Sequence, residues 1–229
     1  MYWIDDFISL IFPRICACCG NSLWRHEEII CQFCEVHLPA THFHMDPDNP
    51  VARTFWGRVR VEAATACYYF NKGSRVQRMV HQLKYKGRKD IGVYLGTRYG
   101  YVLRSVPPYC TADAIIPVPL HRKKYMQRGY NQSEQFAIGL AGGMQVPVNR
   151  SLLVRTMSTE SQTRKSRFSR YQNVKEMFAV TDPEAWRGRH LLLVDDVVTT
   201  GATLESCIQA LSGIAGVKIS VVCIATAML

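Results

Sequence analysis

Short apolar runs alternate with amphipathic stretches along most of the chain, a pattern typical of an α/β fold. Four apolar runs are too short and too continuous for surface helices, and we expect buried strands over residues 61–70, 112–118, 191–194 and 217–224. Two further short strands are expected over 151–156 and 177–180. The pattern therefore predicts buried strands in a sheet, with helices packed on it.

Helical periodicity follows two of these runs. Val76, Met79, Val80 and Leu83 recur at i, i+3, i+4 and i+7, which predicts a helix over 74–86. The same spacing places Leu204, Cys207, Ile208 and Leu211 on one helical face. Further helices are expected over 91–103 and after Asn131, which stands at capping-box spacing from Glu134.

The first residues also have a helical pattern. Ile4, Phe7, Ile8 and Ile11 share a face, and Pro13 ends the helix. The segment has no cationic face for a membrane surface, so we expect it to dock on its own protein.

One stretch combines a buried strand with a chemically specific turn. The run 191–194 leads into Asp195 and Asp196, and then into a hydroxyl-rich turn that begins a helix. A helix N-terminus offers unpaired N–H groups and partial positive charge, which favour a phosphate. The residues of this expected phosphate site are Val197, Val198, Thr199, Thr200, Gly201, Ala202 and Thr203.

The two carboxylates do not attract a phosphate themselves. Their expected partners are sugar hydroxyls, which donate hydrogen bonds, or a hard cation such as Mg²⁺. A phosphate beside a diol indicates a ribose 5-phosphate. Neither G-x-x-x-x-G-K-[ST] nor G-x-G-x-x-G occurs, so a P-loop or dinucleotide site loses its main support. Residues 191–203 resemble the 5-phosphoribosyl 1-pyrophosphate (PRPP) motif of type I phosphoribosyltransferases.

Composition narrows the class of protein. With 229 residues, of which 48% are hydrophobic and 20% charged, the chain has room for one globular domain and a small addition. No apolar run reaches the length of a membrane span, and residues 1–10 lack the basic residue of a secretory signal, so we expect a cytoplasmic protein. The net charge of +10 fits either a solvated basic face or a polyanionic partner.

Nine cysteines in a reducing compartment point to metal binding or buried thiols rather than disulfides. Cys16-x₂-Cys19 and Cys31-x₂-Cys34 form two close pairs, which together suit one tetrahedral Zn²⁺. Four thiolates leave no open position, so the zinc is expected to be structural. A redox pair and reduced core cysteines remain the alternatives, and Cys18 leaves the register of the first pair open.

The cysteine pairs predict a separate N-terminal module. We expect this module over 1–45, a linker over 46–58 and the α/β domain over 59–229. His37, His42 and His44 could also be metal ligands, but we interpret them as linker residues, because four cysteines already complete a metal site.

Three basic segments accompany the expected phosphate site. The end of the helix at 84–89 is either a solvated helix end or an anion site. The loop 117–132 holds Arg122, Lys123, Lys124 and Arg128 without an acid, at the sheet edge where α/β proteins bind ligands, and its cations are candidates to meet a pyrophosphate. The stretch 160–173, with Arg164, Arg167 and Arg170, is either a solvated loop or a mobile lid.

In combination, these motifs resemble the ComF family, also called the competence protein F or GntX-like family. The resemblance covers nearly the whole chain and includes the two cysteine pairs, 83–88 (LKYKGR), 117–121 (PVPLH), 128–132 (RGYNQ), Gln162, Arg170, Asn173 and 194–203 (VDDVVTTGAT). It implies a type I phosphoribosyltransferase fold, a mostly parallel sheet flanked by helices, with a zinc-binding N-terminal extension. It also implies a link to natural transformation, the uptake of single-stranded DNA by bacteria.

The resemblance also implies roles for individual residues. Asp195 and Asp196 would hold the ribose hydroxyls, with Mg²⁺ bridging ribose and pyrophosphate, and residues 199–203 would cradle the 5′-phosphate. Arg122, Lys123 and Arg128 would face the pyrophosphate. The purine-salvage branch has a base-facing Asp where this chain has Thr199, which favours an orotate-like or nonstandard acceptor, or none.

Two classes of function stay open. The first is an enzyme that transfers a pentosyl group, a glycosyltransferase. The intact acidic pair favours PRPP binding, while the absence of residues that would recognise an acceptor counts against turnover. The second is a binding protein on the same fold, either a PRPP sensor or a protein that tracks single-stranded DNA. In the DNA reading, aromatic residues interleaved with cations would stack on bases: Tyr85, Tyr125, Tyr130, Phe168 and Tyr171.

Overall fold

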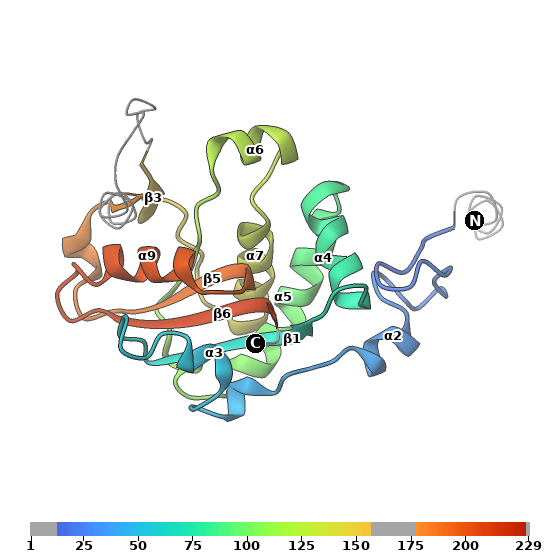
Figure 1. The fold of residues 1–229 in the computed structure, drawn as a ribbon, viewed down its shortest axis with the longest axis horizontal. Coiled ribbons are helices and arrows are strands. Elements are labelled where there is room, and N and C mark those ends of the chain that lie inside the picture. The colour runs from blue at the N-terminus through green and yellow to red at the C-terminus, as the bar shows by residue number, and fades with distance from the viewer. Residues whose placement is uncertain (1–12, 157–176, 228–229) are drawn as a thin grey trace.

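A computed structural model of the chain describes residues 13–156 and 177–227 (Figure 1). Its centre is a four-stranded parallel sheet in the order β1-β6-β5-β2. The strands are β1 (Ala63–Phe70), β2 (Ala114–Pro117), β5 (His190–Val198) and β6 (Lys218–Ala227). A separate antiparallel pair joins β3 (Leu153–Arg155) to β4 (Phe178–Val180). The expected parallel sheet is confirmed.

Helices connect these strands. They are α2 (Gln32–His37), α3 (Pro50–Arg53), α4 (Arg75–Tyr85), α5 (Lys89–Leu103), α6 (Arg122–Arg128), α7 (Gln132–Met144) and α9 (Ala202–Leu211). Short 3-10 turns occur as η1 (Phe43–Met45), η2 (Tyr109–Thr111) and η3 (Pro183–Trp186). The helices expected over 74–86 and 91–103 and after Gly201 are present, while the one expected over 2–12 lies outside the described residues.

Apolar side chains on the two faces of the sheet build two cores. On one face, Leu192 and Val194 of β5 pack with α4, α5 and α7. On the other face, Leu191 and Leu193 pack with α3 and α9. Because successive side chains of a strand point to opposite faces, the four-residue apolar run of β5 supplies both cores, as expected for a strand covered on both sides.

The cysteine module is part of the first core. Cys16, Cys31 and Cys34 are buried in the same cluster as Met79 and Val80 of α4. The side-chain amide of Gln82 also donates a hydrogen bond of 2.8 Å to the carbonyl of Ala17. The module therefore packs directly against the α/β part of the chain.

The segment that follows the module differs from the expected linker. Residues 46–58 contain α3, capped by the side chain of Asn49, and they bury Val51, Ala52 and Phe55 in the second core. The buried Asn49 amide also donates to the Ala64 carbonyl of β1 at 2.8 Å. The stretch is mostly polar and contains prolines, but burial of its few apolar side chains in the second core holds the segment on the sheet. The boundaries of the domains themselves stay predictions.

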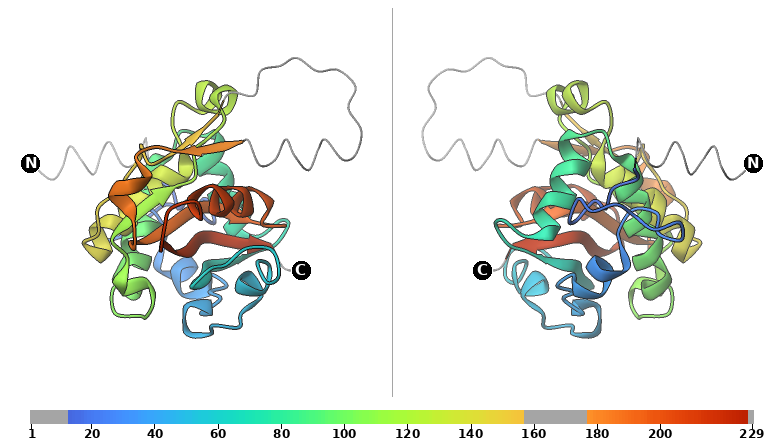
Figure 2. Two further views of the ribbon diagram at one scale, coloured as in Figure 1. Left: turned by 90° about the vertical axis from the view of Figure 1, so that its left-hand side faces the viewer. Right: turned by 90° about the vertical axis from the view of Figure 1, so that its right-hand side faces the viewer.

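The basic loop after β2 also differs from the expectation, because part of it is helical. His121 caps α6 by accepting from the Lys123 N–H at 3.1 Å, and Gly129 ends the helix at a φ of 76°. Figures 1 and 2 show α6 at one extremity of the molecule, beyond α7. The helix that follows begins as predicted, with Asn131 accepting from the Ser133 N–H, but Glu134 pairs with Arg150 instead of completing a capping box.

Helices α5 and α7 approach one another through glycines. A Cβ added at Gly139 would lie within 2.9 Å of backbone atoms of Val93, Gly96 and Thr97. Added atoms at Gly96 and Gly143 would likewise meet the facing backbone. Backbone atoms cannot move aside as flexible side chains do, so these positions fix the distance between the two helices.

We predict opposite effects for two neighbouring glycines of α7. Gly139→Ala should lower the free energy of unfolding by at least about 2 kcal/mol, because the new methyl group meets backbone. Gly142, on the same helix, has no atom within 4 Å of an added Cβ. Gly142→Ala should therefore raise the free energy of unfolding by up to about 1 kcal/mol through helix propensity. Urea unfolding of both variants checks this, and equal effects would contradict the close packing.

Candidate functional site

The acidic pair lies within β5, near its carboxyl end. The strand continues past the predicted 191–194 run to Val198, so Asp195 and Asp196 are strand residues. Val194 is paired with Pro117, where β2 ends, and Asp195 is paired with Cys223 of β6. The pair therefore lies beside the end of β2, at the sheet edge where open α/β sheets bind ligands.

Each carboxylate contacts a different helix. Asp195 Oδ1 accepts a 2.8 Å hydrogen bond from Ser133 Oγ, at the start of α7, and another from the Asp196 N–H. Asp196 Oδ1 lies 3.0 Å from Lys84 Nζ, near the end of α4. These contacts hold both side chains at the junction of β5, α4 and α7.

The carboxyl of Asp195 is unusually easy to protonate. Removal from water and the neighbouring charge of Asp196 raise its pKa to about 7, against the opposing effects of Ser133, the Asp196 N–H and Lys84. Near neutral pH, the Asp195 carboxyl is therefore present in both its protonated and its charged form.

Residues 199–203, which we call the threonine turn, connect β5 to α9. Gly201 is the N-cap residue of α9 and has a φ of 74°, a conformation that favours glycine. Thr199, Thr200 and Thr203 are exposed, whereas Gly201 is buried. The turn therefore presents hydroxyls and the N-terminus of a ten-residue helix to solvent, two residues after the acidic pair.

Near this edge, cations of α5 and α6 lie against tyrosine rings. The Arg128 guanidinium lies 5.1 Å from the ring centre of Tyr85, and Lys89 Nζ lies 5.1 Å from that of Tyr130. Tyr130 in turn donates to the Leu83 carbonyl. The Nε atom of Arg128 is buried and has no hydrogen-bond partner among residues 13–156 and 177–227.

The other predicted basic residues are placed differently. Arg122 and Lys123 are exposed in the first turn of α6, at the opposite end of that helix from Arg128. The lid candidates Arg164, Arg167 and Arg170 lie outside the described residues. The structure brings Lys84 to the acidic pair. From the sequence, the helix end that carries Lys84 was either solvated or an anion site.

The four predicted metal ligands converge in the cysteine module. The sulfur atoms of Cys16, Cys19, Cys31 and Cys34 all lie within 4.8 Å of one another. Sulfurs bound to zinc at about 2.3 Å in a tetrahedron would be about 3.8 Å apart. The sulfurs of Cys19 and Cys31 are separated by 3.8 Å. The cluster therefore fits a structural Zn²⁺.

Backbone donors also suit a thiolate cluster. The N–H groups of Cys18 and Cys31 point at Cys16 Sγ, at 3.4 and 3.3 Å. Burial alone raises the pKa of Cys16, but these donors and that of Cys19 outweigh it and lower the pKa to about 6. The ordered donors favour the charged form that binds metal.

The structure also answers the question of Cys18. Its thiol lies outside the cluster and 3.8 Å from the sulfur of Met79 in α4. Burial raises its pKa to about 12, so it stays a neutral thiol. The sequence did not indicate Glu27, whose carboxylate accepts from the N–H groups of Trp24 and Gln32, both at 2.7 Å, and so fixes the loop between the cysteine pairs.

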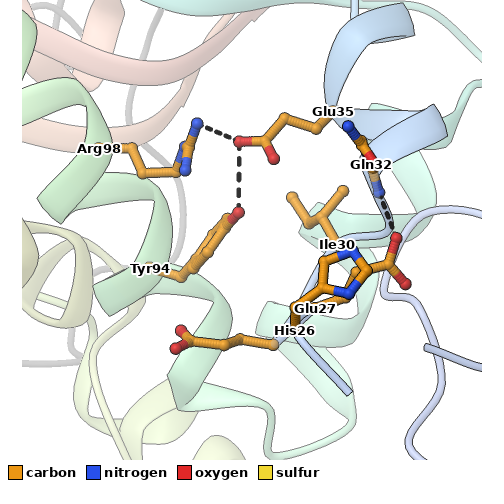
Figure 3. A pocket seen from close by; sticks show the side chains of 8 residues that line it. His26, Glu27, Ile30, Gln32, Glu35, Tyr94 and Arg98 are labelled. Carbon is orange, nitrogen blue, oxygen red and sulfur yellow. Dashed lines mark hydrogen bonds and ion pairs between the residues drawn. The ribbon is translucent and has the colours of Figure 1, made fainter. Parts of the chain in front are cut away.

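A cavity of about 460 Å³ separates part of the cysteine module from α5 (Figure 3). Its lining includes Glu27, Glu28 and Glu35, with His26 and Tyr94. The Glu35 carboxylate pairs with Arg98 and accepts from Tyr94, which ties α2 to α5. Three carboxylates disfavour a phosphate, so this cavity is distinct in chemistry from the edge of the sheet.

Comparisons with known proteins agree with this arrangement. Residues 131–228 match the phosphoribosyl transferase domain family, a range that includes β5, the threonine turn and α9. The DNA utilization protein YhgH of Escherichia coli K12 is 30% identical over 91% of this chain and 89% of its own. Competence protein ComFC of Bacillus subtilis is 24% identical over 91% of this chain and 82% of its own. Competence protein F of Haemophilus influenzae is 36% identical over 41% of each chain.

The sheet, the strand-turn-helix and these matches define a protein with a phosphoribosyltransferase-type domain. The chain belongs to the ComF family, as its motifs indicated. Within the described residues, no helix is both long enough and apolar enough to cross a bilayer.

The position of Cys18 predicts a clear difference between adjacent cysteines. Cys19→Ser should lose the bound zinc, because three thiolates remain. Cys18→Ser should keep one zinc per chain, because its thiol faces Met79. Metal analysis of the two purified variants checks this prediction. Zinc loss in Cys18→Ser, or full retention in Cys19→Ser, would contradict the ligand set.

The raised pKa of Asp195 predicts a pH-dependent stability. Because the pKa in the folded state, about 7, exceeds the ordinary value of 3.8, the folded protein holds this proton more tightly and loses stability as the pH rises from about 4 to 7. Asp195→Asn removes this ionisation and keeps an acceptor for Ser133. The stability of the variant relative to wild type should rise over that window, by at most about 1.4 kcal/mol per pH unit.

Urea unfolding at a series of pH values measures the difference. A difference between Asp195→Asn and wild type that stays constant from pH 4 to 8 would contradict the raised pKa.

Proposed function

We propose that the carboxyl end of β5 binds PRPP together with Mg²⁺, and that the chain acts in pentosyl transfer linked to the use of DNA taken up by competent cells. One observation carries the proposal: two adjacent carboxylates lie two residues before an exposed, hydroxyl-rich turn at a helix N-terminus. The carboxylates suit the ribose diol, and the turn suits the 5′-phosphate. A protein that handled only DNA would have no evident use for this pair.

The residues of the acidic pair fit a magnesium complex of the ligand. Carboxylates are hard oxygen donors, and Mg²⁺ usually combines one or two of them with phosphate oxygens of the substrate. Asp195 Oδ1 is already used by Ser133 and the Asp196 N–H, and Asp196 is paired with Lys84. The protein therefore supplies few free oxygen ligands for Mg²⁺, and oxygen atoms of PRPP would complete its coordination. When bound, Mg²⁺ would neutralise charge on the pyrophosphate.

The reaction would be a displacement at C1 of the ribose. The lone pair of an acceptor forms a new bond to C1 while the bond from C1 to the pyrophosphate oxygen breaks, and pyrophosphate leaves with the electron pair. Arg122, Lys123 and Arg128 are the residues we assign to the departing charge, and the threonine turn positions the sugar. Arg164, Arg167 and Arg170 are assigned to a lid that excludes water.

The chain itself indicates little about the acceptor. Thr199 occupies the position at which purine-salvage enzymes carry a base-facing Asp. Thr199 therefore fits an orotate-like or nonstandard acceptor, or none, and we name no general base. The names of the relatives, competence protein F, competence protein ComFC and DNA utilization protein, support a place for this reaction in DNA uptake or use.

A second candidate is single-stranded DNA binding on the same fold. The observation that favours it is the exposed ring of Tyr85, the last residue of α4, which lies beside Arg128. Stacking of bases on such a ring, with phosphates on nearby cations, is a general mode of single-strand recognition. Binding of this kind weakens steeply as salt rises, whereas the salt dependence of a single-ligand site is shallower.

We predict that PRPP with Mg²⁺ binds the zinc-loaded protein with a micromolar dissociation constant. The double variant Asp195→Asn/Asp196→Asn should weaken binding by at least about a hundredfold, or about 2.7 kcal/mol. Asp182→Asn/Glu184→Gln is a matched control, because it removes two negative charges from the region of η3, before β5 begins. Calorimetric titration of the three proteins measures the difference.

A single-stranded oligonucleotide titrated at two salt concentrations completes the design. Absence of PRPP binding, together with salt-sensitive binding of the oligonucleotide, would overturn the proposed function in favour of DNA handling. Equal loss of PRPP affinity in the control variant would show that charge alone, rather than the acidic pair, is responsible.

A further inference from the structure

Arg58 reaches from the segment after α3 to the threonine turn. Its Nη1 donates to the carbonyl of Thr200 at 3.0 Å and to that of Thr54 at 3.1 Å. Its Nη2 pairs with the carboxylate of Glu205, in the first turns of α9. A single guanidinium thus joins α3, the threonine turn and α9.

The same segment also packs against the glycine of the turn. A Cβ at Gly201 would lie 2.8 Å from Cγ2 of Thr54 and 3.3 Å from the ring of Phe55. Phe55 is fully buried in the second core, so this ring cannot easily withdraw. Residues 54–58 therefore form a brace behind the turn, on a part of the chain that the sequence suggested was a linker.

The hydrogen bond to Thr200 fixes the direction of a neighbouring donor. In a trans peptide, the carbonyl oxygen of one residue and the N–H of the next point to opposite sides of the same plane. Because Arg58 holds the Thr200 carbonyl toward the brace, the Gly201 N–H points away from the brace. Without Arg58, that peptide could turn its carbonyl outward and repel an anion.

Arg58 also compensates a charge at the start of α9. A carboxylate four residues into a helix lies close to any phosphate bound at its N-terminus and would repel it. The ion pair with Arg58 neutralises Glu205, whose side chain is 20% exposed. The brace thus favours anion binding in two ways, through the orientation of a donor and through charge.

We propose that Arg58 is a positioning residue that sets the threonine turn in the conformation that receives a phosphate. The proposal deepens the proposed function and rests on it for the identity of the ligand. The orientation of the turn itself is independent of that function and is measured separately. Nothing in the role requires Arg58 to contact the ligand.

The experiment compares Arg58→Gln, Arg58→Lys and Arg60→Gln by titration with ribose 5-phosphate and Mg²⁺. Arg58→Gln should weaken binding about tenfold, the expected cost of losing a charged hydrogen-bonding group. Arg58→Lys keeps the charge but cannot hold several acceptors in one plane, so its affinity should be intermediate. Arg58 and Arg60 both line a cleft of about 620 Å³ beside the end of α9. Arg60→Gln removes a charge there without touching the brace and should bind like wild type.

Hydrogen exchange of the Glu205 amide, which donates to the Gly201 carbonyl of the turn at 2.8 Å, is measured without ligand and separates the two claims. Faster exchange in Arg58→Gln than in wild type and Arg60→Gln supports the brace, and unchanged exchange overturns it. Wild-type affinity in Arg58→Lys, or equal weakening in Arg60→Gln, would assign the effect to charge and also overturn the proposal. A wild-type protein that binds no ribose 5-phosphate contradicts the proposed function. The exchange rates would still show whether Arg58 holds the threonine turn in place.

Discussion

The candidate site depends on the parallel pairing of β5 with β2 and β6. That pairing buries the apolar run of β5 between two cores and brings the acidic pair to the sheet edge beside the end of β2. Two neighbouring carboxylates in a partly buried place are costly unless they are compensated. Ser133, Lys84 and the Asp196 N–H supply part of that compensation, and a ligand with a diol and a cation would supply more.

The parts of the protein that border this edge come from distant stretches of sequence. Lys84 arrives from α4, Ser133 from α7, and Arg58 from the segment after α3. The cysteine module packs behind α4 through Cys18 and Met79, so a metal in the module would stabilise the helix that carries Lys84. The cysteine module and the candidate ligand site are thereby connected through the first core.

The sequence predicted the sheet, the main helices, the acidic pair with its turn, and the four cysteines that converge. These features depend on local periodicity and on ligand spacing, which are visible in a single chain. It did not predict α6, because a basic stretch between Pro119 and Gly129 has no apolar face, or the packing of 46–58, whose few apolar residues have no strong period. The contacts of Lys84 and Arg58 depend on tertiary structure and could not be read from sequence.

The most direct measurement is a crystal structure of the zinc-loaded protein with ribose 5-phosphate and Mg²⁺. Our account predicts the phosphate against the backbone N–H groups of the threonine turn, including that of Gly201, and the ribose hydroxyls on Asp195 and Asp196. A ligand bound elsewhere, for example among the cations of α6 with the acidic pair still held by Lys84 and Ser133, would contradict it.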